Sequence, residues 1–323
     1  MTRRALVIVA VVIVILIIID LVLVVLALQK TAPQPATTPG PIPTFTSPAS
    51  PVPSPSGTVT PGAGAGAGAA AASPSSTAST ATAVTGVAGD RMLSAVSATE
   101  AWRATAGACD GAAPLLEHST DGGVTWNAVQ LPASVQAIAG LRASTAHVAI
   151  LGATGTACTA QDFVSTNAGG TWSPSSDPSV AGAGLLSGSV HLTSGSTVAA
   201  PCSGAFAVFE GNTTTTVLCP DVLVWRSGTG AWVHVPVTGL AALTVNGSSY
   251  TIARQGVAGC SGIAVDSMVA YGVTPASTLK QLGCASKLTS NGGGPVAIAQ
   301  TGSDVWLWGG SSVARSLTGG ASW

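Results

Sequence analysis

The stretch Ser119–Trp126, with the sequence STDGGVTW, decides how the whole chain is interpreted. Related stretches read STNAGGTW at Ser165–Trp172 and SLTGGASW at Ser316–Trp323. All three fit one pattern: serine, any residue, a polar residue, any residue, glycine, any residue, threonine or serine, and tryptophan. A shorter copy, RSGTGAW, lies at Arg226–Trp232. The recurrence indicates one structural unit that is used several times.

Each copy predicts a tight hairpin between two β-strands. The oxygen of the polar side chain accepts hydrogen bonds from backbone N–H groups of the turn, and the glycine adopts a positive φ that other residues avoid. The threonine and tryptophan open the next strand, where the indole ring is buried. The residues assigned to the three full hairpins are Ser119, Asp121, Gly123, Thr125, Trp126, Ser165, Asn167, Gly169, Thr171, Trp172, Ser316, Gly320, Ser322 and Trp323.

The spacing of the hairpins predicts a β-propeller. Trp126 and Trp172 are 46 residues apart, Trp172 and Trp232 are 60 apart, and Trp232 and Trp323 are 91 apart. A period near 45 residues suits a four-stranded blade. We interpret the 60-residue interval as one unit with an insertion of about 14 residues. The 91-residue interval then holds two units, with a degenerate hairpin near Ala276–Leu282. The prediction is an all-β propeller of about five four-stranded blades; the alternative is coincidence in a chain rich in glycine, serine and threonine.

The composition excludes several classes of protein. The chain of 323 residues is 46% hydrophobic and only 7% charged, yet only one apolar run is long enough to span a bilayer. A net charge of −1 leaves no basic surface, so a nucleic acid is not expected as a partner. Three lysines against eight arginines, with abundant alanine and glycine, favour a bacterial source with a GC-rich genome.

Residues 5–28 form the long apolar run, interrupted only by Asp20. A 24-residue helix is roughly 36 Å long, which is enough to cross a membrane with some tilt. Arg3 and Arg4 keep residues 1–4 in the cytoplasm, so the rest of the chain is expected outside. A cleaved signal peptide is the alternative, but its apolar core is normally shorter. Asp20 either contacts a partner helix or is protonated or directed toward the headgroups.

A linker of residues 29–80 follows the predicted anchor. Eleven of the 20 prolines lie there, together with many Thr, Ser, Gly and Ala residues, so the segment cannot bury enough apolar surface to fold. Residues 81–323 remain for the propeller domain. Within it, residues 81–88 are expected to supply the outer strand of the last blade and so to close the ring. Two weak glycosylation sequons start at Asn212 and Asn246.

Short apolar runs predict individual strands of the propeller, and no long helical periodicity is present after residue 81. The predicted strands are Arg91–Val96, Glu100–Arg103, Ala146–Leu151, Ala205–Phe209, Val222–Trp225, Ser249–Ile252 and Val305–Trp308.

Six cysteines are expected to form disulfides, because the domain is predicted to lie outside the cytoplasm. Six cysteines allow 15 pairings. We favour pairing between sequence neighbours, without excluding the others: Cys109 with Cys158, Cys202 with Cys219, and Cys260 with Cys284. The CxxC spacing of metal sites is absent from the sequence, so no metal is expected.

The hairpin pattern resembles the Asp-box, or BNR, repeat of sialidase-like propellers and of photosystem II assembly factor-like propellers. The resemblance rests on Asp121, Gly123, Thr125 and Trp126 and on their counterparts in the other two copies. In those families the residues are structural and lie far from any catalytic centre. Asn167 and Thr318 replace the aspartate here, so the resemblance implies weaker capping in those two turns.

The catalytic residues of sialidases are not recognisable in this sequence. The family uses an arginine triad, a tyrosine nucleophile with a glutamate partner, and an acid/base aspartate. We therefore carry over no catalytic residue. The groups that could have supplied them, none in a recognisable context, are Tyr250, Tyr271, Glu100, Glu117, Glu210, Arg91, Arg103, Arg142, Arg226, Arg254 and Arg315.

Other candidate chemistry is weak. Glu117 and His118 are neighbours on a strand, so they face opposite sides and are interpreted as an exposed polar strand end. The four histidines (118, 147, 191 and 234) lack metal-site spacing. Four further tryptophans either line a binding face or belong to the blade cores: Trp102, Trp225, Trp306 and Trp308.

The preferred function is a membrane-anchored extracytoplasmic propeller that binds a protein or cell-envelope (glycan) ligand without catalysis and without a cofactor. The alternative is a sialidase-like glycoside hydrolase with a divergent site, which needs two carboxylates about 5–10 Å apart. Such a site would draw on Asp110, Asp162, Asp177 or Asp221. A third possibility is a scaffold that acts through Asp20 and the anchor.

Overall fold

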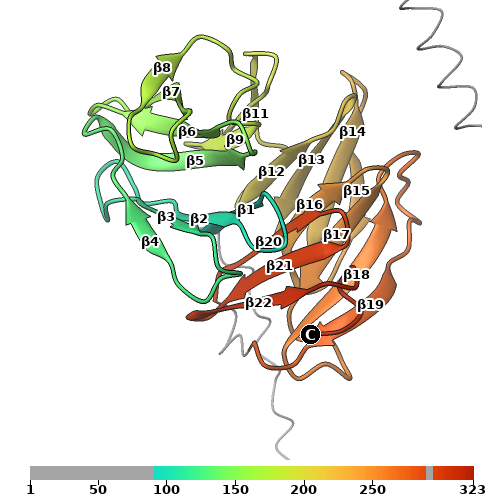
Figure 1. Cartoon of the computed structure of the whole chain (residues 1–323). Helices are drawn as coiled ribbons and strands as arrows, with labels where there is room; N and C mark the ends of the chain where they lie inside the picture. Colours follow the sequence, from blue (N-terminus) through green and yellow to red (C-terminus); the bar gives the residue numbers. More distant parts are fainter. Residues whose placement is uncertain (1–90, 289–293) are drawn as a thin grey trace, which may run out of the picture. The chain divides into compact units, whose positions relative to one another are not determined.

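The computed structural model describes residues 91–288 and 294–323. In these residues 22 β-strands form six antiparallel sheets, each an up-and-down blade, arranged as a ring (Figure 1). The fold is therefore an all-β propeller, as predicted, but with six blades where the sequence predicted five.

Blades 1 and 2 have four strands each. Blade 1 contains β1 (Arg91–Ala95), β2 (Ala101–Thr105), β3 (Leu115–Ser119) and β4 (Asn127–Val129). Blade 2 contains β5 (Val135–Ala143), β6 (Val148–Thr154), β7 (Thr159–Ser165) and β8 (Ser173–Ser175).

Blade 3 is small, whereas blade 4 is regular. Blade 3 contains three strands of three residues each: β9 (Gly184–Leu186), β10 (Ser189–His191) and β11 (Thr197–Ala199). Blade 4 contains β12 (Ala207–Glu210), β13 (Thr214–Cys219), β14 (Val222–Ser227) and β15 (Val233–Pro236).

Blades 5 and 6 complete the ring. Blade 5 contains β16 (Leu240–Asn246), β17 (Ser249–Arg254), β18 (Ile263–Val269) and β19 (Lys280–Ala285). Blade 6 has three strands within the described residues: β20 (Val296–Thr301), β21 (Asp304–Gly309) and β22 (Ser312–Ser316). All seven strands predicted from the sequence are present, with ends that differ by a few residues.

The error in the blade count has a specific cause. The 60 residues between Trp172 and Trp232 contain blade 3 as well as most of blade 4. They are not one unit with an insertion. Blade 3 has no tryptophan hairpin, and its strands are too short to give a clear alternating pattern. The other spacings were interpreted correctly: the 91-residue interval holds two units, and the degenerate hairpin lies between β18 and β19.

Blade 3 also runs in an unexpected direction. A side-chain carbon placed on Gly182 would meet the guanidinium of Arg142, and one placed on Gly184 would meet the carbonyl of Ala139. The segment that leads into β9 therefore lies first beside the end of β5 and then beside the middle of β5. This order means that β9 runs antiparallel to β5. The turn between β10 and β11 consequently lies at the same end of the ring as the last residue of β5.

The core is divided between the blades, as expected for sheets that pack face to face around a ring. The fully buried side chains include Trp102, Leu116 and Ile150 in blades 1 and 2, and Tyr250, Ile252 and Trp306 in blades 5 and 6. Apolar side chains that are buried between neighbouring sheets supply most of the stabilisation of the folded state.

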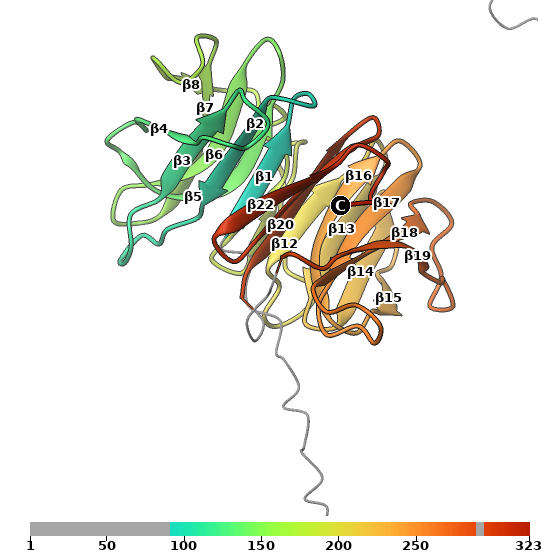
Figure 2. The ribbon, with the colours of Figure 1, turned by 60° about the horizontal axis from the view of Figure 1, so that its bottom comes forward.

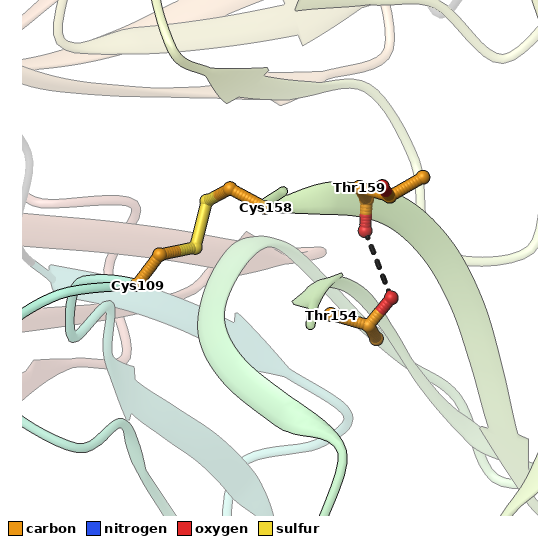
Figure 3. Close-up of a disulfide and its surroundings, with 4 residues drawn as sticks. All are labelled: Cys109, Thr154, Cys158 and Thr159. Carbon is orange, nitrogen blue, oxygen red and sulfur yellow. Dashed lines mark hydrogen bonds between the residues drawn. A yellow bond between two sulfur atoms is a disulfide. The ribbon is translucent and has the colours of Figure 1, made fainter. Parts of the chain in front are cut away.

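The two faces of the ring differ in their connections. The face that carries the hairpins between third and fourth strands is called the hairpin face below, and the opposite face is called the entry face, because β1 begins there. Cys109 and Cys158 lie in the second-to-third connections of blades 1 and 2, at the entry face, and form a disulfide (Figure 3). The two other disulfides join Cys202 to Cys219 and Cys260 to Cys284. All three favoured pairings are confirmed.

Several predictions concern residues that the structure does not describe. The N-terminal anchor at residues 5–28, its Asp20, the linker and the closing segment at residues 81–88 all lie outside the described residues. Among the residues that are described, no helix is long and apolar enough to cross a membrane.

The disulfide between blades 1 and 2 should stabilise the ring substantially. It closes a loop with a sequence separation of 49 residues. Replacing Cys109 and Cys158 together with alanine should lower the free energy of unfolding by roughly 4 kcal/mol, because the unfolded chain gains conformational freedom. Denaturant unfolding under oxidising conditions measures the loss. Under reducing conditions, where the wild type also lacks the bond, the wild type and the double variant should have equal free energies of unfolding. A loss of the same size under reducing conditions would contradict the assignment to the disulfide.

Candidate functional site

A cavity of about 500 Å³ lies along the axis of the ring. Its wall is made by the innermost strands of all six blades, β1, β5, β9, β12, β16 and β20. Figure 2 shows the ribbon from a second side, with β1, β5, β12, β16 and β20 labelled. Most of the lining side chains are apolar, for example Leu93, Phe206 and Phe209. Small-molecule and peptide sites in proteins typically combine such a volume and apolar lining with a few polar groups. The axial cavity is therefore the leading candidate site.

Only three formally charged residues line the axial cavity among those described: Arg91, Arg142 and Glu210. Arg142 and Glu210 occupy the ends of β5 and β12, so they lie at the hairpin-face end, on either side of blade 3. Arg91 begins β1 and lies at the entry face. There its guanidinium stacks 4.2 Å from the ring centroid of Trp308, and its Nη1 donates to the carbonyl of Pro295 over 3.3 Å.

Among the described residues, Arg142 and Glu210 make hydrogen bonds only to the backbone. Arg142 Nη1 donates to the carbonyl of Ser179 over 3.0 Å, and Glu210 Oε2 accepts from the N–H of Thr193 over 2.6 Å. The ion pairs of the described residues are Arg103–Glu117, His118–Glu100 and Arg254–Asp266, so neither of the two is neutralised by a described partner. The hairpin-face end of the cavity therefore offers one cationic and one anionic group to a ligand.

The glycoside hydrolase alternative needs two carboxylates in one pocket, and the described lining of the axial cavity contains one, Glu210. The aspartates considered for that role are dispersed. Asp110 is exposed in the β2–β3 connection, and Asp221 caps a turn by accepting the N–H of Gly239 over 2.7 Å. Asp162 lines a separate, smaller cavity between blades 2 and 3, and the charge of Asp177 acts on it from outside the lining.

The remaining sialidase-type candidates also fail to converge on the axis. Tyr250 is buried, and its hydroxyl shares a hydrogen bond of 2.8 Å with Thr216. Tyr271 is exposed in the β18–β19 connection. Arg254 pairs with buried Asp266 at 2.7 Å, and Arg103 pairs with Glu117 at 2.7 Å. The two arginine pairs lie within blades 5 and 1, the Tyr250 bond joins blade 5 to blade 4, and none of these groups lines the axial cavity.

Glu117 and His118 do face opposite sides of β3, as predicted, but they are not an exposed strand end. Glu117 binds Arg103, whereas His118 stacks on Trp102 with 3.9 Å between ring centroids. His118 Nε2 also lies 3.1 Å from Glu100 Oε1. Both side chains are mostly buried between strands, which corrects that interpretation. Among the described residues, no cluster of His, Cys, Asp and Glu is suited to hold a metal ion.

The four additional tryptophans are buried in blades and do not line a binding face. Trp102 and Trp306 are at most 2% exposed, and Trp225 and Trp308 are below 10%. Trp225 Nε1 donates to the carbonyl of Ala270 over 3.2 Å. The binding-face interpretation of these residues was therefore wrong, and the core interpretation was right.

The three tryptophan hairpins occupy equivalent places, each after the third strand of its blade. In blade 1, the Oγ of Ser119 accepts the N–H of Gly123 over 2.9 Å, and the carboxylate of Asp121 accepts the N–H of Thr125 over 3.0 Å. Gly123 has a φ of 86°. The serine is fully buried. The sequence pattern predicted the turn and the positive φ, but it gave no reason to expect that the serine hydroxyl is central.

The same hydrogen bonds recur in the other two hairpins. Gly169 N donates to Ser165 Oγ over 2.9 Å, and Thr171 N donates to Asn167 Oδ1 over 2.9 Å. In blade 6, Gly320 N donates to Ser316 Oγ over 3.0 Å, and Ser322 N donates to Thr318 Oγ1 over 2.9 Å. Asparagine and threonine thus accept the same bond as the aspartate, but without its charge.

Each hairpin glycine also contacts the preceding blade. A side-chain carbon at Gly123 would lie 3.0 Å from Trp306 of blade 6, and one at Gly320 would lie 3.0 Å from Val265 of blade 5. At Gly169 it would overlap Val129 of blade 1. The tryptophans themselves are half-buried: Trp126 and Trp323 donate to their own turns, whereas Trp172 Nε1 donates to Gln130 of blade 1 over 3.0 Å.

No protein-family profile and no curated protein sequence matches the chain. Solved structures that resemble it include YCF48 bound to D1 peptide, with 16% identity, a TM-score of 0.25, and coverage of 71% of this chain and 64% of that chain. A Hadza microbial sialidase, Hz136, has 15% identity, a TM-score of 0.33, and coverage of 68% and 49%. A mutant of AofleA from Arthrobotrys oligospora has 10% identity, a TM-score of 0.39, and coverage of 71% and 83%. The chain thus spans less than two thirds of the YCF48 chain, and the likeness concerns the fold alone.

Replacing Gly169 with alanine should destabilise the propeller strongly. The residue has a φ of 81°, and an added methyl group would overlap Val129. We expect a loss of about 3 kcal/mol or more from backbone strain and overpacking together. Gly155→Ala is the matched control, because its φ is 65° and nothing lies within 4 Å of the added carbon. That control should lose about 1 kcal/mol. Equal losses in denaturant unfolding would contradict the contact between blades.

The hairpin of blade 1 should respond to acid. Hydrogen bonds from the Thr125 hydroxyl and then from its N–H lower the pKa of Asp121 to about 2. Because the folded-state pKa is depressed, this contribution to stability is complete above the ordinary pKa of the carboxyl, and it is lost as the pH falls toward 2. Asp121→Asn should remove it. The difference in melting temperature between the two proteins should therefore shrink between pH 5 and pH 2, as measured by circular dichroism; a constant difference would contradict this.

Proposed function

We propose that the chain is a membrane-anchored extracytoplasmic binding protein, which holds a protein segment or a cell-envelope glycan in its axial cavity without catalysing a reaction. The main support for this proposal is the cavity of about 500 Å³, where Arg142 and Glu210 lie at the end of an apolar wall. Neither residue forms an ion pair with the other or with another described residue. A charged group at the end of an apolar cavity is stabilised most when a ligand supplies the opposite charge.

The chemistry of the cavity suits binding better than hydrolysis. Its charged groups are two arginines and one carboxylate, and the carboxylate accepts a backbone N–H. An extended segment with polar groups at one end could contact Arg142 and Glu210 while its apolar part lies against Leu93 and Phe209. We further propose that the three turns are Asp-box repeats with a structural role, as their shared hydrogen bonds suggest.

The proposed location rests on independent features of the chain. Three disulfides are typical of proteins that fold outside the cytoplasm. The apolar run at residues 5–28 is long enough for an anchor, and residues 29–80 have the composition of a spacer. On this proposal the membrane is a partner of residues 5–28, and the propeller lies outside the cell.

The location can be tested with the full chain in bacterial spheroplasts. External protease should cut within residues 29–80 and release a compact fragment that retains its disulfides, while residues 1–28 stay with the membrane. Recovery of the uncut chain from sealed spheroplasts, or from the soluble fraction, would contradict the proposed topology.

The binding site can be tested with the detergent-solubilised full chain and two probe sets, muropeptide fragments of the cell wall and a library of unstructured peptides. At least one probe set should contain ligands of micromolar affinity, and Arg142→Ala with Glu210→Ala should weaken them by tenfold or more. Lys280→Ala is the control, because Lys280 is exposed on β19, away from the axis. Binding that is insensitive to the double variant would place the site elsewhere, and hydrolysis of a muropeptide would refute the non-catalytic role.

A further inference from the structure

A second cavity, of about 150 Å³, lies between blades 2 and 3. Blade 2 contributes Leu151, Ala160 and Asp162 to its wall, and blade 3 contributes His191. Pro178, from the connection between the two blades, covers part of it. The function proposed above does not use this cavity.

Asp162 is the unusual group in this cavity. It lies in the middle of β7, and its Oδ1 atom is shielded from solvent with no hydrogen-bond partner among the described residues. Buried carboxylate oxygens are normally paired, because desolvation without a hydrogen bond is costly. Burial, and then the charge of Asp177, raises the pKa of Asp162 to about 6. The carboxyl group is therefore mostly ionised at pH 7, despite the missing donor.

The charged surroundings do not supply that donor. Burial lowers the pKa of His191, so its imidazole is neutral at pH 7. Asp177 is the second acid, and its Oδ1 accepts the N–H of Ser179 over 2.9 Å. Arg142 is near Gly182, which also lines the cavity, but its Nη1 donates to the carbonyl of Ser179. No lysine or arginine is among the described lining residues, so the cavity is negative at neutral pH.

The size of the cavity limits what could supply the missing donor. A protein cavity of about 150 Å³ holds a molecule the size of benzene, with six heavy atoms. A lysine side chain beyond Cα has five: four methylene carbons and one nitrogen. Its methylene groups would lie against Leu151, Ala160 and Pro178, which form the apolar part of the wall. An arginine side chain is longer and carries a planar head, so it fits less well.

We propose that the cavity between blades 2 and 3 binds a primary alkylammonium group, whose N–H donates to the carboxylate of Asp162, for which no described residue supplies a donor. The group belongs either to a lysine side chain of a partner protein or to a free small amine. This site is distinct from the axial cavity, so the proposal does not depend on the function proposed above.

The direct test titrates the full chain with n-butylamine, which has the five heavy atoms of the lysine side chain, and follows binding by calorimetry. We expect a dissociation constant on the order of 1 mM, as is reasonable for so small a ligand. Asp162→Asn keeps the shape of the side chain and should weaken binding at least tenfold. Asp110→Asn removes the same charge from an exposed loop and should leave binding unchanged. n-Butanol and butyrate at the same concentration should not bind.

A second variant guards against indirect effects of the Asp162 substitution. Ala160→Leu fills the cavity but keeps the carboxylate, and it should also abolish butylamine binding. Both variants should keep the wild-type far-ultraviolet spectrum. Failure of butylamine to bind the wild-type chain, or equal binding to the wild type and to Asp162→Asn, would overturn the proposal.

Two further arms identify the source of the amine and its pH dependence. A peptide with one central lysine that binds at least tenfold more tightly than butylamine would assign the site to a partner protein, and equal or weaker binding would assign it to a free amine. Butylamine affinity should fall severalfold from pH 7.5 to pH 5, because Asp162 becomes protonated while the amine stays charged. His191 lines the site, and its protonation acts in the same direction. Asp177, which lies outside the lining, stays ionised over this range because hydrogen bonds from Ser179 lower its pKa. Affinity that rises toward pH 5 would overturn the proposal.

Discussion

The contact between blade 1 and blade 6 is the constraint on which the ring depends, because it joins sheets more than 200 residues apart in sequence. Arg103 of blade 1 lies between two indole rings, 4.3 Å from the centroid of Trp126 and 4.8 Å from that of Trp308. Trp306 donates its Nε1 proton to the carbonyl of Ser97 over 3.1 Å, and Arg315 donates to the carbonyl of Ala98. Stacked guanidinium and indole groups combine apolar contact with a cation–π attraction, which suits a seam that is partly open to solvent.

The two faces of the ring are held by different means. On the hairpin face, a buried serine hydroxyl fixes each of the three tryptophan hairpins, and the glycine of each hairpin packs against the preceding blade. The entry face is held by disulfides. Cys109–Cys158 joins neighbouring blades, Cys202–Cys219 joins the segment before β12 to the end of β13, and Cys260–Cys284 joins the β17–β18 connection to β19. The axial cavity runs between two rims that are each stiffened, so its shape is set before a ligand arrives.

Much of the fold could be predicted from the sequence, because a repeated turn has strong local requirements. The hairpins and the strands follow from side chains that are close in sequence, and each disulfide joins cysteines that are neighbours in the order of the six along the chain. Blade 3 could not be predicted, because its three-residue strands carry no periodic signal and no tryptophan. The candidate sites were missed for a related reason. Arg142, Glu210 and Asp162 are unremarkable in sequence, and they matter only because of which strand ends and which blades the ring brings together.

The small, reversed blade 3 also sets the geometry of recognition. A ring of identical sheets would offer a guest on its axis several equivalent orientations, and the guest could rotate among them. Here blade 3 has strands of only three residues, and opposite charges, Arg142 and Glu210, lie on the two blades beside it. A ligand with its own dipole would therefore have one preferred orientation about the axis of the ring.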